Sequence, residues 1–321
     1  MQLLTEMLAR PALRAGDVAK IGERLVFSQA RYGNHPLLRI TKAATAHIFS
    51  GHPYAATLTA QTIASIGDDQ IRAFHQQAYS ANNLDIGLVG NLTREEARQL
   101  VDDLVRALPQ GWAAQRTPSV PHYQALDLNL AAASSTTQAT LTLATNVSAQ
   151  DPVFPALYLL NAILGSSYES RLTQELRTLR NLTYAISCDL RPLDAASQLQ
   201  IHWDIAPQYR DASGALVSAI LACLREHGPS QAECDMAVNQ IAGKLHHSLA
   251  DRARMAQALA TYSHQGLAPD HLGAFLGKLS ALTPANLREA AQVWLQAPQV
   301  FVTSGPVTEQ LPLPKPTALD Q

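Results

Sequence analysis

The first hundred residues carry apolar positions at helical spacing. In 17–31, Val18, Ile21 and Leu25 recur every three or four positions, which is the pattern of an amphipathic helix. The same spacing predicts helices over 1–17, 38–49, 68–79 and 93–108. A short apolar run at 84–89 precedes a glycine and is predicted to be a buried strand.

The pattern changes after residue 108. Residues 109–123 hold three prolines and show no apolar period, which is typical of a linker. Beyond the linker, short apolar or alternating runs predict strands at 126–132, 136–145, 183–190, 198–205 and 300–304. Longer periodic runs predict helices at 154–164, 170–179, 211–226, 230–248, 251–265 and 285–295. Strands mixed with long helices, without strict alternation, favour an α+β fold with an antiparallel-rich sheet packed by helices.

The two parts of the chain end alike. Residues 71–90 and 287–305 each give a helix, a short connection and an apolar run stopped by glycine, and Arg72 corresponds to Arg288. The same order repeated at such a long period indicates duplicated domains. In this alignment nothing in the first copy matches residues 126–218. We therefore expect a first domain truncated at its N-terminus. The chain would then be a truncated product, have a misassigned start or be one piece of a complex.

These patterns set the expected domain organisation. Residues 1–108 are predicted to be the C-terminal part of a first domain, and 109–124 a linker. Residues 125–310 are predicted to form a complete second domain, and 311–321 a tail.

Composition narrows the function classes. The 321 residues carry a net charge of -2 with both signs mixed along the chain, which argues against a nucleic-acid surface. No apolar run approaches the roughly 20 residues that span a bilayer, and the N-terminus lacks the pattern of a signal peptide. The three cysteines (Cys188, Cys223 and Cys234) are far apart, so we interpret them as small apolar side chains rather than a disulfide framework or metal site.

One segment carries a motif that is specific enough to indicate a protein family. Residues 165–187 read GSSYESRLTQELRTLRNLTYAIS. This resembles the second-domain signature of the pitrilysin/insulinase/mitochondrial processing peptidase family of zinc metallopeptidases, the inverzincins. The matching positions are Gly165, Ser170, Arg171, Leu172, Leu176, Arg177, Leu182 and Tyr184. Asn181 stands where the family usually has glycine, and asparagine is the residue that next most readily adopts a positive φ.

The resemblance implies where the family's zinc chemistry lies. There a His-Xaa-Xaa-Glu-His helix in the first domain supplies two zinc ligands and a base, and a later glutamate supplies the third ligand. No such motif occurs in this chain. Glu23 and Arg24 match the start of the helix that carries the later glutamate, but the ligand position holds Ala30. We expect no catalytic residue, no metal ligand and no cofactor in this chain, with zinc in a catalytic partner or in the missing domain half.

The resemblance also implies two substrate-binding residues, Arg177 and Tyr184. In the family, the matching side chains reach the substrate backbone, where a guanidinium and a phenol donate hydrogen bonds to a carbonyl. The competing interpretation is an ordinary surface arginine paired with Glu175 or Glu169, beside a half-buried strand tyrosine.

The leading hypothesis is a non-catalytic, peptide-binding part of an inverzincin-type protease. It would bind extended peptide at a sheet edge and work with a catalytic sister subunit of the same family. The first alternative is the C-terminal portion of a catalytic single-chain enzyme, and the second is a structural scaffold subunit. The compartment stays undecided, with the bacterial periplasm or cell envelope favoured for the full-length parent.

Overall fold

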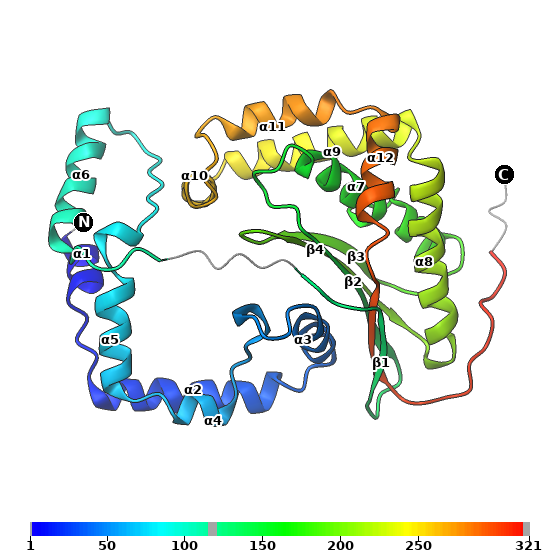
Figure 1. The fold of residues 1–321 in the computed structure, drawn as a ribbon, viewed down its shortest axis with the longest axis horizontal. Coiled ribbons are helices and arrows are strands. Elements are labelled where there is room, and N and C mark those ends of the chain that lie inside the picture. Colours follow the sequence, from blue (N-terminus) through cyan, green and yellow to red (C-terminus); the bar gives the residue numbers. More distant parts are fainter. Residues whose placement is uncertain (1, 115–120, 317–321) are drawn as a thin grey trace. The chain divides into compact units, whose positions relative to one another are not determined.

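The computed structural model describes residues 2–114 and 121–316 (Figure 1). It divides into two units, each assembled from separate stretches of chain. The helical unit contains residues 2–33, 57–114 and 245–271. The sheet unit contains residues 34–56, 121–244 and 272–316.

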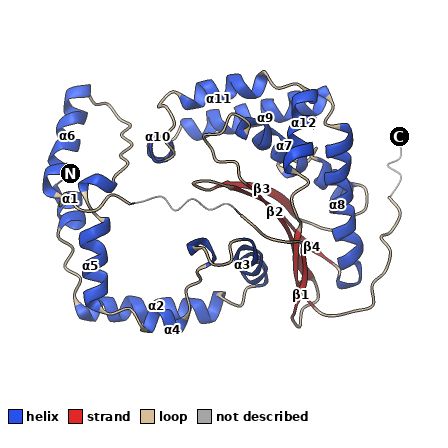
Figure 2. Ribbon diagram, viewed as in Figure 1, coloured by secondary structure: helices blue, strands red, loops and turns tan. Residues whose placement is uncertain are grey.

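A five-stranded sheet organises the sheet unit (Figure 2). Its strands, in spatial order, are β1 (Leu126–Ala131), β5 (Val300–Gly305), β2 (Thr137–Thr145), β4 (Ser197–Ile205) and β3 (Ile186–Pro192). The first pair is parallel and the other three are antiparallel. The predicted α+β class with an antiparallel-rich sheet is confirmed, and β3 forms one edge of the sheet.

Helices cover both faces of this sheet. The apolar side chains of β5 point alternately to the two faces, so each face is buried. Val300 and Val302 are fully buried in a core with Ile40, Ala44 and Ile48 of α3 (Pro36–Ile48). Phe301, between the two valines, turns to the other face, where it stacks on Trp203 of β4 at 5.8 Å between ring centroids. On that face lie α7 (Phe154–Gly165), α8 (Arg210–His227) and α12 (Pro284–Trp294).

The remaining helices of this unit are α9 (Gln231–Leu249), whose last residues belong to the helical unit, and α11 (His271–Ser280). Two short 3-10 turns, η1 (Pro53–Ala55) and η4 (Pro207–Tyr209), join longer elements. No helix in the described part of the chain is both long and apolar enough to cross a membrane.

The helical unit contains α1 (Gln2–Ala9), α2 (Ala15–Tyr32), α4 (Ala60–Ala64), α5 (Asp68–Ala78), η2 (Ala81–Asn83), α6 (Arg94–Ala107) and α10 (Arg252–His264). A capping box begins α6, because the side chains of Thr93 and Glu96 accept hydrogen bonds from each other's backbone N–H. Residues 8–13 hold α5 in place, since Arg72 donates to the carbonyl of Leu13 in the loop after α1 and His75 lies 2.8 Å from that of Leu8 in α1.

The predicted strand at 84–89 is wrong. These residues form no strand, because their neighbour is a helix rather than another strand. A Cβ on Gly87 would lie 2.0 Å from the carbonyl oxygen of Ala256 in α10. Ser263, also in α10, donates to Asp85 at 2.5 Å. The segment therefore packs along α10, which offers it no backbone groups for a ladder.

Each of the two units combines separate stretches of chain, and the predicted domain boundaries stay a prediction. Residues 34–56 join the sheet unit, because the apolar face of α3 is buried against β5 and β2. Residues 245–271 join the helical unit instead. Part of the predicted linker, 115–120, and part of the predicted tail, 317–321, lie outside the described residues.

Candidate functional site

A groove of about 520 Å³ lies at the edge of the sheet unit. The carboxyl end of α7, the segment 168–185, the first half of β3 and one side chain of α9 form its walls. Both predicted site residues, Arg177 and Tyr184, line it. The groove also contains Tyr168, Asp189 and Lys244, so it combines aromatic rings with charged groups.

The open edge of β3 is one wall of the groove. Ile186, Ser187, Cys188 and Asp189 line it in unbroken succession. Successive side chains of a strand point to opposite faces of the sheet, so four consecutive lining residues mean that the groove runs along the strand's edge. On its other side β3 pairs antiparallel with β4. An unpaired strand edge presents backbone donors and acceptors that an additional strand can use.

Arg177 reaches the groove from a π-helical turn, η3 (Thr173–Thr178). The sequence predicted an ordinary helix here, but the N–H of Leu179 bonds the carbonyl of Gln174, five residues back. Leu176 anchors the turn, being fully buried. Short π-turns are rare and occur often at functional sites, because the wider turn changes the direction of its side chains.

A left-handed (αL) C-cap ends this turn and leads the chain to Tyr184. The N–H of Asn181 bonds the carbonyl of Arg177, and that of Leu182 bonds Leu176. The motif needs a left-handed residue, and Asn181 has φ 51°, as its sequence position predicted. Thr183 then donates to Asp204 at 2.6 Å and fixes the start of the following segment to β4.

The two predicted site residues are in contact. The guanidinium carbon of Arg177 lies 4.9 Å from the ring centroid of Tyr184 and 5.0 Å from that of Tyr168. Tyr184 is 80% exposed and precedes β3, so it is not a half-buried strand tyrosine. Sequence reasoning missed Tyr168, whose only signal was an aromatic side chain within the GSSYES stretch.

The alternative ion pairs proposed for Arg177 are not observed. Glu175 pairs with Arg180 at 3.1 Å, and Glu169 accepts from Gln240. Within residues 2–114 and 121–316, the guanidinium N–H groups of Arg177 make no hydrogen bond or ion pair. The site therefore holds a guanidinium in place by aromatic contacts and leaves its donors available.

Arg171, in the same sequence signature, has a structural role instead. Its Nε and Nη2 bond the two carboxylate oxygens of Glu233 at 2.7 and 3.0 Å, and Nη2 also bonds the carbonyl of Gly228. Burial alone would raise the pKa of Glu233, but hydrogen bonds from Arg171 and from the N–H of Ser230 outweigh it and lower the pKa to about 2. The pair ties the groove's helical turn to the start of α9.

The groove offers hydrogen-bond donors rather than an activated nucleophile. Burial raises the pKa of the Cys188 thiol well above its ordinary value, so the thiol stays neutral, and a neutral thiol reacts poorly. His202 pairs with Ser187 across the β3–β4 ladder. Its pKa is lowered by burial, against the opposing effect of Asp189.

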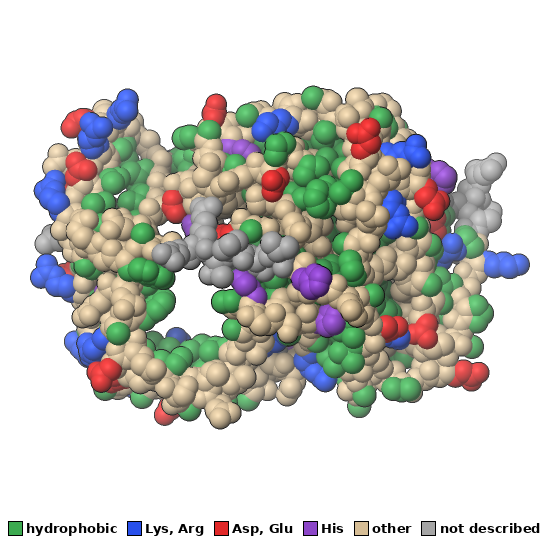
Figure 3. Space-filling view, in the orientation of Figure 1, with side chains coloured by type: hydrophobic (Ala, Val, Ile, Leu, Met, Phe, Trp, Pro, Cys, Tyr) green, Lys and Arg blue, Asp and Glu red, His purple; other side chains and the backbone are tan. Residues whose placement is uncertain are grey.

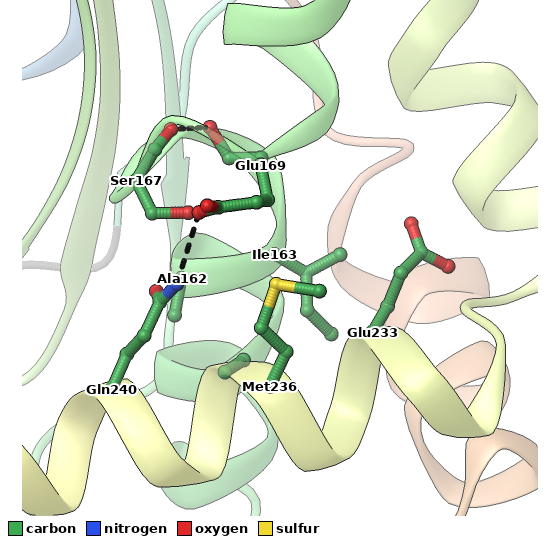
Figure 4. Close-up of a pocket in the computed structure, with 9 residues that line it drawn as sticks. Ala162, Ile163, Ser167, Glu169, Glu233, Met236 and Gln240 are labelled. Carbon is green, nitrogen blue, oxygen red and sulfur yellow. Dashed lines mark hydrogen bonds between the residues drawn. The ribbon is translucent and has the colours of Figure 1, made fainter.

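Two other hollows lack this chemistry. A crevice between α7 and α9, lined by Ser167, Met236 and Gln240 among others (Figure 4), has about 10 Å³, which is room for one water at most. In the helical unit, an apolar hollow of about 980 Å³ runs along α2, where Glu23 and Asp68 are the only charged lining residues among those described. On the face of the molecule that Figure 3 shows, acidic and basic side chains are interspersed.

The described residues do not fit a zinc site. Among them, no group of three or more His, Cys, Asp or Glu side chains is close enough together to hold a metal ion. Ala30, at the position predicted from the family for the third ligand, lies on α2 and lines the apolar hollow. No step through zinc is therefore assigned to this part of the chain.

Comparison with known proteins identifies relatives. A family model described as "Peptidase M16 inactive domain" matches residues 65–241. The chain is 24% identical to an uncharacterised zinc protease of Mycobacterium leprae over 232 residues, which are 70% of this chain and 48% of that protein. It is 23% identical to the uncharacterised zinc protease YmxG of Bacillus subtilis over 225 residues, 70% of this chain and 50% of that protein. The chain thus spans about half the length of the curated relatives it matches.

Solved structures agree with these relatives. A peptidase M16 inactive domain from Pseudomonas fluorescens is 27% identical, with a TM-score of 0.93, and the match covers 98% of this chain and 76% of that one. A protease from Helicobacter pylori matches at 17% identity and a TM-score of 0.78, over 95% and 75% of the two chains. The periplasmic protease PqqL of Escherichia coli matches at 14% identity and 0.69, over 90% of this chain and 32% of that one. At such low identity the last two show a shared fold alone.

Proposed function

Since the chain belongs to the M16 peptidase family, through the inactive-domain model that it matches, we propose that it binds extended peptides without cleaving them. The predicted resemblance to the pitrilysin/insulinase/mitochondrial processing peptidase family is thereby confirmed. Cleavage would fall to a part that carries His-Xaa-Xaa-Glu-His. That part is a sister subunit in the leading version and another region of a longer polypeptide in the alternative.

One observation carries this proposal: Arg177 and Tyr184 meet in a groove that runs along the open edge of β3. An extended peptide added to β3 would bond the strand's backbone, which gives affinity with little demand on sequence. The guanidinium and the phenol would donate to its carbonyl groups at the start of the strand. Every group in this scheme acts by binding, and none by breaking a bond.

Peptide binding by the full chain tests the proposal. Fluorescence anisotropy of a labelled, unstructured twelve-residue peptide would give the dissociation constant for wild type and for Arg177→Ala and Tyr184→Phe. We expect Arg177→Ala to weaken binding by about tenfold or more, since hydrogen bonds to a charged group contribute about 1.5–3 kcal/mol. Arg106→Ala serves as the matched control, because Arg106 is an exposed arginine on α6.

The alternatives predict other results. A scaffold subunit would bind no peptide at any concentration tested, and that result would overturn the proposal. Wild-type affinity in both groove variants would show that peptide binds elsewhere on the chain. If a catalytic sister subunit is obtained, the same two variants should lower the proteolytic rate of the reconstituted pair.

A further inference from the structure

Arg177 differs from the two arginines beside it. Arg171 is paired with Glu233 and Arg180 with Glu175, so the carboxylates of Glu233 and Glu175 are already occupied. In the described part of the chain, the Arg177 guanidinium has no carboxylate partner, and its aromatic contacts are the rings of Tyr168 and Tyr184. A guanidinium that is fixed by rings and has unused N–H groups matches a planar carboxylate, which it binds through two parallel hydrogen bonds.

Charges of opposite sign lie at different points along the groove. Arg177 contacts Tyr184, two residues before β3 begins, whereas Asp189 lies three residues into the strand. At about 3.3 Å per residue, Ile186 and Asp189 are separated by about 10 Å. Lys244 lines the same groove, and its Nζ donates to the carbonyl of Ser166 at 3.1 Å. Two cations therefore face one carboxylate, which favours an anionic ligand.

We propose that the groove binds the free α-carboxylate at the end of an extended peptide, with Arg177 as its bidentate donor. This inference rests on the proposed function and specifies the ligand of the same site. The carboxylate lies at the start of β3, so the peptide runs antiparallel to that strand. Asp189 then faces a residue about three positions before the peptide's end, where a lysine fits best.

Tyr168 is a positioning residue in this scheme. Its ring holds the guanidinium from the turn that follows α7, while Tyr184 holds it from the segment before β3. The ring, rather than the hydroxyl, makes this contact. Tyr168→Phe should therefore keep the preference for a carboxylate, and Tyr168→Ala should reduce it.

The test compares two forms of one peptide on the full-length chain. A labelled ten-residue peptide, with lysine three positions before its last residue, is made with a free C-terminal carboxylate or with a C-terminal amide. Anisotropy gives the dissociation constant of each. We expect wild type to bind the acid about tenfold more tightly than the amide, and Arg177→Gln to bring the acid to the affinity of the amide. Circular dichroism establishes that each variant is folded.

Each outcome is decisive. Equal binding of acid and amide by wild type overturns this inference but leaves the proposed function intact. A preference for the acid that survives in folded Arg177→Gln also overturns it, because another group must then hold the carboxylate. If neither form binds, both the inference and the proposed function fail. Loss of the preference in Tyr168→Ala, with retention in Tyr168→Phe, supports the positioning role.

Discussion

The ion pair between Arg171 and Glu233 gives a quantitative test of how the groove is held together. Both side chains are mostly buried, at 21% and 27% exposed, and two hydrogen bonds join them. Glu233 also accepts the N–H and the hydroxyl of Ser230. Lowering the pKa of Glu233 from 4.5 to about 2 corresponds to about 3 kcal/mol of stabilisation. Screening by solvent at this partly exposed pair reduces the figure to about 2 kcal/mol.

The direction of the pH dependence follows from the same shift. The pKa of Glu233 is lower in the folded state than in the unfolded state, so its stabilisation is complete above pH 4.5 and is lost as the pH falls towards 2. At pH 3 the unfolded chain is mostly protonated at this group while the folded chain is mostly ionised. The stabilisation should then be less than half of its value at pH 7.

A double-mutant cycle with Arg171→Met and Glu233→Gln isolates the interaction. Urea unfolding, followed by the fluorescence of tryptophans such as the buried Trp203, should give a coupling free energy of about 2 kcal/mol at pH 7. The control pair is Arg106 and Asp103, whose side chains are 70% and 52% exposed at 3.4 Å. Their coupling should be below about 0.5 kcal/mol. A Glu233 coupling as small as the control, or one unchanged at pH 3, would refute the reasoning.

Three further predictions concern stability and use the same unfolding assay. Asn181→Gly should leave the free energy of unfolding nearly unchanged, whereas Asn181→Val should lower it by about 1–2 kcal/mol because φ is positive there; equal effects would contradict the left-handed turn. Gly165→Ala should cost about 1–3 kcal/mol, since the new Cβ would lie 2.4 Å from Cβ of Cys188, and a neutral result would mean that α7 and β3 are farther apart. Ile48→Ala should cost about 3 kcal/mol while Leu38→Ala, at 43% exposure on the same helix, should cost under about 1. Similar costs for those two variants would argue against burial of α3 on the sheet.

The sequence predicted best where local rules determine the structure. Periodicity found most of the helices and the five strands, because each carries its own pattern of apolar positions. The signature around Asn181 predicted a left-handed turn, since few residue types adopt that conformation. The same signature led to Arg177 and Tyr184, which the fold brings into contact.

Features that depend on distant partners were not predictable. The apolar run at 84–89 has the composition of a strand, but it packs on α10, far along the chain. Nothing in α3 itself indicates that it packs against β5. Tyr168 was missed because its role depends on contact with a guanidinium that the π-turn directs. The helix α11 was also missed, since no element was predicted over its residues.

The place of β5 in the sheet bears on how the protein is synthesised. Within the described residues, β5 lies between β1 and β2, and Leu126 of β1 has its strand neighbour at Val300. A ribosome releases the chain from its N-terminus, and β1 must therefore wait unpaired until β5 has emerged. Closing such a long loop is entropically costly and slow. Nascent chains stalled before residue 300 should therefore expose an unpaired strand edge and depend on chaperones, whereas those released beyond residue 305 can complete the sheet.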